Sequence, residues 1–460
     1  MNIKSRRIIM FSFISAFFIL APILIFYASG YRYDLKRHKI IKTGTLMLEA
    51  KNLNKANLYL NDKLYEKPFD EKIFVYNLLP GEYTVKLSKE GYHPWQKKIT
   101  ISSSLTTFEK DIILFQNNVP LQIIDGQIVD FSLSPDYQKI VYTNLNGPFS
   151  ELYLFDLTLN EKKLLYRIPA NAKIFINWAP SSKKILLKVD SDFLIFEQQN
   201  FVQALEIKDI LNFNPTITKW DIQSDNLLYA LKQNKIYKID LLSKTSQVVF
   251  NALKETIKPE FFVEGNDLFY IQEAETENIL YKYNFNFKTT KKILAISKAN
   301  DYQFSQSVNN FLGLLDSDQQ KYYLIKKINT GQEINILLEE PIREFTAKAA
   351  SWDINEKKLL LYDDFEINTF DVGNNEKVFV NRYGQVIKKA AWYPDLQHIV
   401  ILFENNLQII DLTDDNNSHN STEIIKYDHL DNFYLDDKGE NIYFNGQIGK
   451  QQGLYQLKLK

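Results

Sequence analysis

The sequence predicts an all-β chain with an N-terminal transmembrane helix, a small antiparallel β-sandwich and a β-propeller of eight blades. Three observations carry this prediction: an uncharged apolar segment near Met1, six short strand-like segments after it, and eight repeats in the rest of the 460 residues. We divide the chain into a basic N-terminus, the helix, a juxtamembrane linker, the sandwich and the propeller, at residues 1–7, 8–28, 29–42, 43–117 and 118–460.

The apolar segment, residues 8–28, reads IIMFSFISAFFILAPILIFYA and carries no charge. About 20 apolar residues in a helix cross a hydrocarbon core of about 30 Å, and a membrane helix tolerates a proline such as Pro22. A cleaved signal peptide is the alternative, because Ala28, Ser29 and Gly30 form a small-x-small site. The apolar stretch exceeds the 7–15 residues of a signal h-region, so we expect an uncleaved anchor that contacts membrane lipid.

Basic residues flank both ends of this segment, so the positive-inside rule nearly balances. They are Lys4, Arg6 and Arg7 on one side and Arg32, Lys36, Arg37 and Lys39 on the other. We expect a single-pass protein of the cytoplasmic membrane with its N-terminus inside and its C-terminal domains outside the cytoplasm, because this order resembles known single-pass envelope proteins. Cytoplasmic C-terminal domains are the alternative.

The charge and cysteine content of the chain exclude some classes of partner and site. The formal net charge of −1 gives no net electrostatic attraction to nucleic acid. The absence of cysteine excludes disulfides and thiolate zinc sites but fits either compartment.

Residues 43–117 contain six strand-like segments within about 70 residues, which is typical of a small antiparallel sandwich. Turn signals separate the segments, including Pro80-Gly81 and Glu90-Gly91, where glycine supplies a permissive backbone. The segments are GTLMLEA, ANLYLND, EKIFVYNL, EYTVKLS, QKKITIS and FEKDIIL, starting at Gly44, Ala56, Glu71, Glu82, Gln96 and Phe108.

Residues 78–101, LLPGEYTVKLSKEGYHPWQKKITI, resemble the second half of a PEGA domain, in which a Pro-Gly turn leads to a strand, a Gly-Tyr pair and another strand. The first half departs from the family. Its Pro-x-Gly-Ala segment would fall at 53–56, where only Ala56 is kept, its Asp-Gly turn appears as Asp62-Lys63, and Pro68 stands where a Thr-Pro pair is usual.

The order of membrane helix, GYRYD segment (30–34), PEGA-like domain and propeller is similar to a family of bacterial membrane proteins. The resemblance implies contact with the cell envelope and no catalytic activity.

The propeller repeats each begin at an aromatic or large apolar anchor, which is followed seven positions later by an aliphatic strand. A polar turn rich in Pro, Asp and Ser lies between them, and the interval of about 40–48 residues is typical of four-stranded propeller blades. Seven blades are the alternative, because the units from about Ile257 and Asp301 match least well. The anchors are Leu133, Trp178, Trp220, Phe262, Phe304, Trp352, Trp392 and Leu435.

The last repeat stops at Lys460 just after its third strand, and Val119–Ile124 is a strand without a partner of its own. We expect this early strand to complete the last blade, which would close the ring and remove an exposed sheet edge.

Catalytic and metal motifs are absent from the sequence. The five histidines include no pair at metal-ligand spacing, and there is no HExxH, GxSxG or phosphate-binding loop. We therefore expect no cofactor, metal or catalytic residue. Carboxylate pairs such as Asp363-Asp364 and Asp436-Asp437 are interpreted as solvated turns, and the oxygen-rich loop 414–421 as an ordinary loop rather than a calcium site.

Two aromatic groups remain. We expect the anchor tryptophans to pack between blades rather than to stack on carbohydrate. Trp95 and Tyr92, at the turn after EYTVKLSKEG, are a possible surface contact with the membrane, the propeller or a wall polymer; packing within the domain is the alternative.

The sequence therefore predicts a membrane-anchored, non-catalytic envelope protein whose propeller binds an envelope protein or a cell-wall glycan. The alternative is a small-ligand sensor or an enzyme that uses carboxylates at the mouth of the propeller channel. Convergent acidic or histidine side chains with strongly shifted pKa values would favour that alternative, and a mixed lining would count against it.

Overall fold

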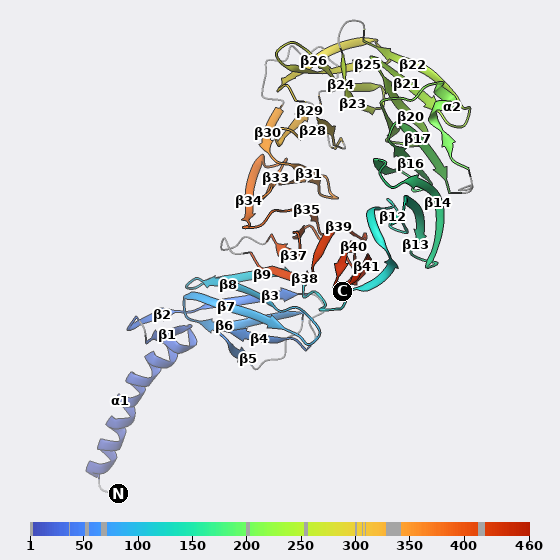
Figure 1. Ribbon diagram of the computed structural model, residues 1–460. Coiled ribbons are helices and arrows are strands. Elements are labelled where there is room, and N and C mark those ends of the chain that lie inside the picture. The colour runs from blue at the N-terminus through green and yellow to red at the C-terminus, as the bar shows by residue number, and fades with distance from the viewer. Residues whose placement is uncertain are drawn as a thin grey trace.

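The computed structural model describes residues 3–35, 37–50, 55–65, 71–198, 203–252, 256–299, 301–305, 307–308, 310–327, 342–412 and 419–460. A long N-terminal helix leads to a small β-domain, and a ring of β-sheets follows (Figure 1). The predicted fold class, nearly all β with one N-terminal apolar helix and a propeller, is confirmed.

Helix α1 (Ile3–Ala28) exposes its apolar side chains along its whole length. The part from Ser5 to Ala28 is long and apolar enough to cross a membrane. The next residues, expected as a plain linker, form a hairpin of β1 (Tyr31–Asp34) and β2 (Lys39–Lys42), in which Tyr31 pairs with Lys42.

The small β-domain is a sandwich of two sheets. Strands β5 (Lys63–Tyr65), β4 (Asn57–Leu60), β7 (Gly81–Ser88) and β8 (Trp95–Ile101) form one sheet, and β6 (Lys72–Leu78), β3 (Gly44–Ala50) and β9 (Thr106–Ile112) form the other. All six expected segments are strands. The expectation of a wholly antiparallel sandwich is wrong for one pair: β3 and β9 run parallel, because the chain changes sheets between β8 and β9.

Seven of the propeller sheets are built from consecutive strands. They are β11 (Gln127–Leu133), β12 (Lys139–Asn146), β13 (Phe149–Asp156) and β14 (Glu161–Pro169); β15 (Ile174–Trp178), β16 (Lys184–Val189), β17 (Asp192–Glu197) and β18 (Leu205–Glu206), followed by helix α2 (Ile207–Leu211); β19 (Ile217–Asp221), β20 (Ser224–Lys232), β21 (Lys235–Asp240) and β22 (Thr245–Asn251); β23 (Ile257–Glu264), β24 (Asp267–Glu273), β25 (Asn278–Asn284) and β26 (Thr289–Ile296); β27 (Tyr302–Phe304), β28 (Phe311–Asp316), β29 (Lys321–Lys326) and β30 (Ile342–Thr346); β31 (Ala349–Trp352), β32 (Lys358–Tyr362), β33 (Glu366–Asp371) and β34 (Glu376–Arg382); and β35 (Lys389–Trp392), β36 (His398–Leu402), β37 (Asn406–Asp411) and β38 (Ser421–Lys426).

The last sheet contains β39 (His429–Leu435), β40 (Asn441–Ile448) and β41 (Gln451–Lys458), and its fourth strand is β10 (Leu121–Asp125). Leu121 pairs with Gln456 and Asp125 with Gly453. The predicted completion of the last blade by an early strand is confirmed. Gly453 is needed there, because an added Cβ would lie 2.2 Å from the backbone oxygen of Ile124.

Each predicted anchor lies at or near the end of the first strand of its sheet, and the turn after it has a repeated geometry. In five sheets the residue four positions after the anchor has a left-handed backbone, and its N–H donates to the carbonyl three residues earlier. These residues are Tyr137, Ser182, Glu356, Leu396 and Gly439. The sequence signal for a tight polar turn is therefore confirmed.

Hydrophobic cores join each propeller sheet to its neighbour. Leu152 of the first sheet packs with Trp178 of the second, for example, and Leu402 of β36 packs with Phe433 of β39. One core joins the last sheet to the first, through Phe131 and Leu454. The described residues form eight such cores for eight sheets, so the ring of Figure 1 is closed by packing as well as by β10.

The sandwich rests against the propeller beside β38 (Figure 1). Phe115 is buried at the junction, with its ring centroid 5.5 Å from that of Tyr393 and edge-on to it. The N–H of Gln116 donates to the carbonyl of Leu459 at 2.8 Å, and the N–H of Gln96 donates to Oδ1 of Asn420 at 3.3 Å. These contacts hold the sandwich at one side of the ring.

Candidate functional site

The anchor tryptophans pack between blades, as predicted. Trp178 and Trp220 are less than one-tenth exposed, and each indole N–H points at a backbone carbonyl of the preceding blade. Trp392 does the same with Ser351, at 3.1 Å. The indole N–H of Trp352 is buried without a partner among the described residues. Carbohydrate stacking does not describe these rings, since their faces lie in the cores.

Trp95 is not available as a surface contact. It is 2% exposed and lies in the core of the sandwich with Leu87 and Ile99. It begins β8, in which alternate side chains point inward, and the alternation places the indole on the core side. Packing within the domain is therefore the interpretation that fits Trp95. Tyr92 is half-buried against the same core, and Nζ of Lys89 lies 4.5 Å from its ring centroid.

Charged side chains meet on the first strands of three neighbouring blades. We call Asp130, Lys389, Asn432 and Tyr434 the inner-strand cluster. Nζ of Lys389 donates to Oδ1 of Asn432 at 2.8 Å and to the carbonyl of Phe433 at 2.7 Å. The same ammonium lies 4.0 Å from the ring centroid of Tyr434, within cation–π range.

This environment changes the proton affinity of the cluster. Burial lowers the pKa of Lys389 to about 8, and the charge of Asp130 opposes that shift. Partial desolvation raises the pKa of Asp130, while the hydrogen bond from the N–H of Phe131 and the charge of Lys389 lower it. In the cluster, the charges of Lys389 and Asp130 each offset part of the effect of desolvation on the pKa of the other.

An ion pair lies on the blades at the opposite side of the ring. Lys219 of β19 pairs with Glu260 of β23, and Glu260 also accepts a hydrogen bond from the N–H of Phe304 at 2.8 Å. Burial raises the pKa of Glu260, while Lys219 lowers it. One carboxylate thus links three blades, which gives it a structural role. The first strand of the second blade, β15, exposes uncharged side chains, including Asn177 and Phe175, the latter 64% exposed.

A cavity of about 350 Å³ opens where the first strands of the last, first and second blades end. We call it the aromatic cavity. Its lining includes three aromatic side chains together with serine and asparagine groups; Tyr137 is 41% exposed, whereas Trp178 is 8% exposed and belongs to the core between the first two blades. The lining residues are Ser132, Leu133, Ser134, Pro135, Tyr137, Ile176, Asn177, Trp178, Tyr434 and Leu435.

A cavity of about 370 Å³ lies at the other end of β11 and β39 and includes His429 and Asp431. The two ring nitrogens of His429 face Oε1 of Glu404 and Oδ1 of Asp431, at 2.5 and 2.6 Å. Lys388 completes this group by pairing with Glu404 at 2.8 Å, and its hydrogen bond is the main cause of the lowered pKa of Glu404. These groups satisfy one another across two blades.

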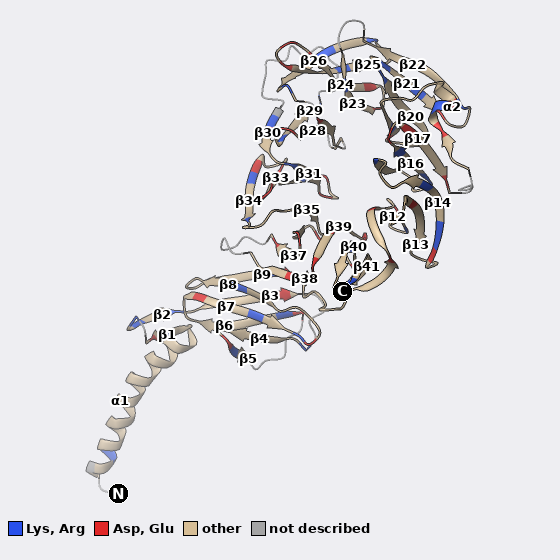
Figure 2. Cartoon of the chain, viewed as in Figure 1, with Lys and Arg blue, Asp and Glu red and all other residues tan. Residues whose placement is uncertain are grey.

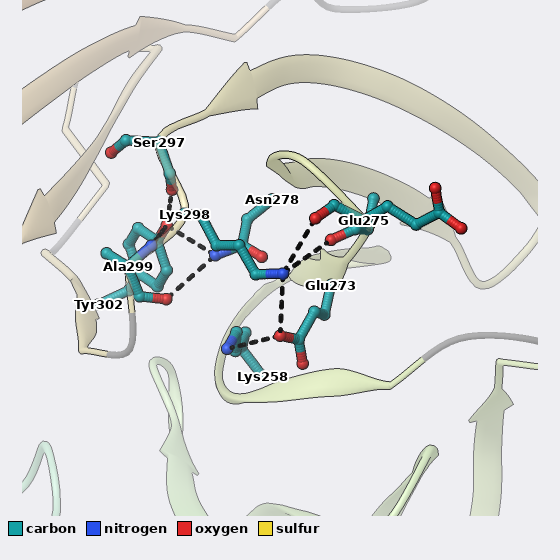
Figure 3. Close-up of polar contacts among 9 residues, drawn as sticks. Lys258, Glu273, Glu275, Asn278, Ser297, Lys298, Ala299 and Tyr302 are labelled. Carbon is teal, nitrogen blue, oxygen red and sulfur yellow. Dashed lines mark hydrogen bonds and ion pairs between the residues drawn. The ribbon is translucent and has the colours of Figure 1, made fainter.

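Other polar groups serve the fold. In Figure 3, Asn278 of the fourth blade points at Tyr302, which begins the fifth blade, and at the carbonyl of Ala299 in the connection between them, and it donates to them at 2.9 and 3.1 Å. Lys298 closes over the nearby hairpin toward Glu273. His398 begins β36, and its Nδ1 lies 2.7 Å from Oδ2 of Asp395.

The carboxylate pairs behave as turn residues where they are described. Oδ1 of Asp363 accepts the N–H groups of Phe365 and Glu366, both at 2.8 Å. Asp436 accepts those of Glu440 and Asn441. Most of the oxygen-rich loop 414–421 lies outside the described residues. Within the described ranges, no group of three His, Asp or Glu side chains is placed to hold a metal ion.

Sequence reasoning did not find the inner-strand cluster. Lys389 and Asp130 stand three residues before their anchors, and this spacing was the available signal. The residues three positions before the eight anchors are of several chemical types, charged, polar and apolar. The repeat pattern therefore gave no sign that Lys389 and Asp130 belong to one cluster.

The sandwich and the propeller each resemble known proteins. Residues 73–116, which span β7 to β9 and nearly all of β6, match the PEGA domain family. No curated protein matches the sequence. The chain is similar to the solved C-terminal WD40 domain of Sif2, at 12% identity over 74% of this chain and 98% of that one, with a TM-score of 0.50. The Dos1 propeller matches at 10% identity over 74% and 95%, with a TM-score of 0.48. The likeness to the WD40 domain shows the propeller fold alone.

Proposed function

We propose that this protein is a membrane-anchored, non-catalytic scaffold of the cell envelope whose propeller binds a protein or a cell-wall glycan at the aromatic cavity. The cavity is the observation that carries the proposal. Exposed aromatic side chains beside hydrogen-bonding groups are enriched where proteins bind partners, and here Tyr137, Tyr434 and Asn177 line one recess.

The rest of the chain supports display at a membrane. Helix α1 precedes the sandwich and the ring, so the chain carries an apolar tether, a spacer at 43–117 and a binding ring at 118–460. The PEGA match of residues 73–116 supports a place in the envelope. We propose a single pass with the N-terminus inside and the later domains outside the cytoplasm.

The enzyme or sensor alternative receives less support. It needs carboxylates that converge at a channel mouth. In the described residues, Asp130 lies beside Lys389 and Glu260 is paired with Lys219, while Asn177 and Phe175 are uncharged neighbours. His429 does lie between Glu404 and Asp431, but Lys388 pairs with Glu404 at 2.8 Å, so the described carboxylates near the inner strands are engaged by cations.

A binding comparison tests the cavity. The full chain in detergent would be immobilised as wild type, Tyr137→Ala and Tyr166→Ala, the last being a control because Tyr166 is exposed on the outer strand β14. Solubilised envelope proteins and soluble wall-glycan fragments would be applied separately. We expect Tyr137→Ala to lose at least about tenfold in affinity, as interface aromatics commonly do, and Tyr166→Ala to bind as the wild type. Equal binding by all three chains, or no binding of either class, would overturn the proposal.

Single cysteines test the topology, because the natural chain has none. Leu159→Cys, at an exposed propeller turn, should react with a membrane-impermeant maleimide in intact cells. Labelling only after the cells are opened would place the propeller in the cytoplasm.

A further inference from the structure

The hairpin that follows helix α1 exposes large apolar side chains. Tyr33 is 54% exposed, Leu35 77% and Ile40 64%, although the hairpin is only two short strands. Exposed apolar groups that lie together usually mark a surface that is covered in use. These three continue the apolar surface of α1, which ends five residues before Tyr33.

The same hairpin is basic. Arg37, Lys39 and Lys42 are exposed. Its one carboxylate, Asp34, is 6% exposed and pairs with Arg37 at 3.8 Å, so it adds little negative charge to the surface. In Figure 2, α1 carries charged residues only near its N-terminal end, and basic residues occur again in the hairpin.

The hairpin is fixed to the end of the helix. The guanidinium of Arg32 lies 3.6 Å from the ring centroid of Tyr27 and donates to the carbonyl of Tyr27 at 2.7 Å. The rings of Phe26 and Tyr31 meet edge to face at 5.3 Å. These contacts hold the hairpin within a few ångströms of the last helical turn, the depth at which a membrane helix leaves the hydrocarbon.

The hairpin is also fixed to the sandwich. Both the N–H and the hydroxyl of Thr43 donate to the carbonyl of Gly30, at 2.9 and 2.8 Å. Ser103, in the turn between β8 and β9, donates to the carbonyl of Lys42 at 2.9 Å. These bonds fix the position of the sandwich relative to the hairpin.

We propose that the β1–β2 hairpin is a lipid-binding element. Tyr33, Leu35 and Ile40 enter the interfacial layer of the bilayer, and Arg37, Lys39 and Lys42 bind anionic phospholipid headgroups. Aromatic and basic side chains are the groups that this layer favours. The element holds the sandwich against the membrane surface. This inference rests on the proposed anchoring by α1.

The test uses the full chain reconstituted into vesicles, with an environment-sensitive dye on one introduced cysteine. Phe13→Cys reports the helix and Leu35→Cys the hairpin. Leu159→Cys, at a propeller leucine that is 66% exposed against 77% for Leu35, is the matched control. The vesicles contain phosphatidylcholine, with or without phosphatidylglycerol, and a lipid-borne quencher. We expect quenching at positions 13 and 35 and none at 159.

The outcomes separate the two proposals. Quenching at 13 without quenching at 35 would overturn the hairpin proposal and leave the anchor standing. An absence of quenching at 13 would overturn the anchor itself. Circular dichroism of each labelled chain establishes that it is folded.

The charge requirement has its own test. Adding Lys39→Gln and Lys42→Gln to the Leu35→Cys chain should lower the ratio of inserted to free hairpin roughly fivefold per lysine in vesicles with phosphatidylglycerol. It should have little effect in phosphatidylcholine alone. Equal quenching in both lipids, unaffected by the two substitutions, would overturn the binding of anionic headgroups.

Discussion

The indole N–H of Trp178 donates to the backbone carbonyl of Ser132, the residue just before the anchor of the preceding blade, at 3.4 Å. Trp220 and Trp392 repeat this contact with Asn177 and Ser351, which also precede anchors. Tryptophan thus recurs in the repeat because it fills a core between blades and also hydrogen-bonds the neighbouring strand.

The tryptophan contact predicts a difference between two equivalent substitutions. Trp178→Phe removes a hydrogen bond and should cost about 1 kcal/mol beyond the change in packing. Trp352→Phe removes a buried donor that has no partner among the described residues, so it should be less costly or even stabilising. Urea unfolding followed by circular dichroism compares the two. Equal losses would contradict the role assigned to the indole N–H.

Ring closure depends on which face of β10 is altered. Ile124 is 5% exposed in the closing core, whereas Leu121 in the same strand is 64% exposed. Ile124→Asp should destabilise the propeller by more than about 3 kcal/mol, because it removes apolar burial and buries a carboxylate. Leu121→Asp should change stability by less than about 0.5 kcal/mol. Limited proteolysis near β41 would detect the opened blade, and equal resistance of both variants would refute the closure argument.

A buried ion pair crosses the sandwich. Nζ of Lys97 lies 3.1 Å from Oε2 of Glu109, and both side chains are at most 1% exposed. Lys97→Met leaves a buried carboxylate and should cost about 3–5 kcal/mol, whereas the double variant Lys97→Met, Glu109→Leu should recover most or all of that loss. Thermal unfolding of the two chains gives the comparison. A double variant as unstable as the single one would show that packing, rather than charge, decides the effect.

The lowered pKa of Lys389 predicts a pH dependence of stability. Between about pH 8 and about 10.5 the unfolded lysine holds a proton that the folded one has released, so Lys389 contributes a rise of the unfolding free energy with pH in this window. The tyrosines whose pKa is raised by burial, such as Tyr229 and Tyr322, contribute a fall toward its upper end. Lys389→Met should remove that rise, and Lys450→Met, at an exposed position, should keep it. The measurement is the slope of the unfolding free energy against pH rather than its absolute value. A wild-type slope equal to that of the Lys389→Met chain would contradict the assignment.

The repeated anchor pattern explains why the propeller could be predicted from the sequence. Eight anchors at regular intervals, and a strand without a partner at 119–124, were sufficient to predict the propeller and its closure, because each blade repeats the same packing problem. Positions that depend on a single non-local contact were not predictable. Lys97 follows the inward alternation of β8, yet its partner Glu109 lies in the other sheet, and nothing in either strand announces the pair.

The same limit applies to Trp95 and to the hairpin. The turn before Trp95 suggested exposure, but the strand begins at that residue and its alternation places the ring inside. Residues 29–42 lack a long alternating pattern. Their two strands pair with each other, and the bonds of Arg32 to Tyr27 and of Ser103 to Lys42 join them to the helix and the sandwich. Local pattern does not contain those bonds.

Closure by β10 sets an order of events during biosynthesis. The edge of β10 is covered only when β41 has been made: the side chain of Gln122 donates to the carbonyl of Gln452, 330 positions later, and Gln122 pairs with Tyr455. At 5–20 residues per second this delay is about 15 to 70 s. For that time an unpaired strand edge and a half-built core stand open, and such edges invite pairing with other chains. The incomplete ring is therefore open to pairing with other chains until β41 has been synthesised.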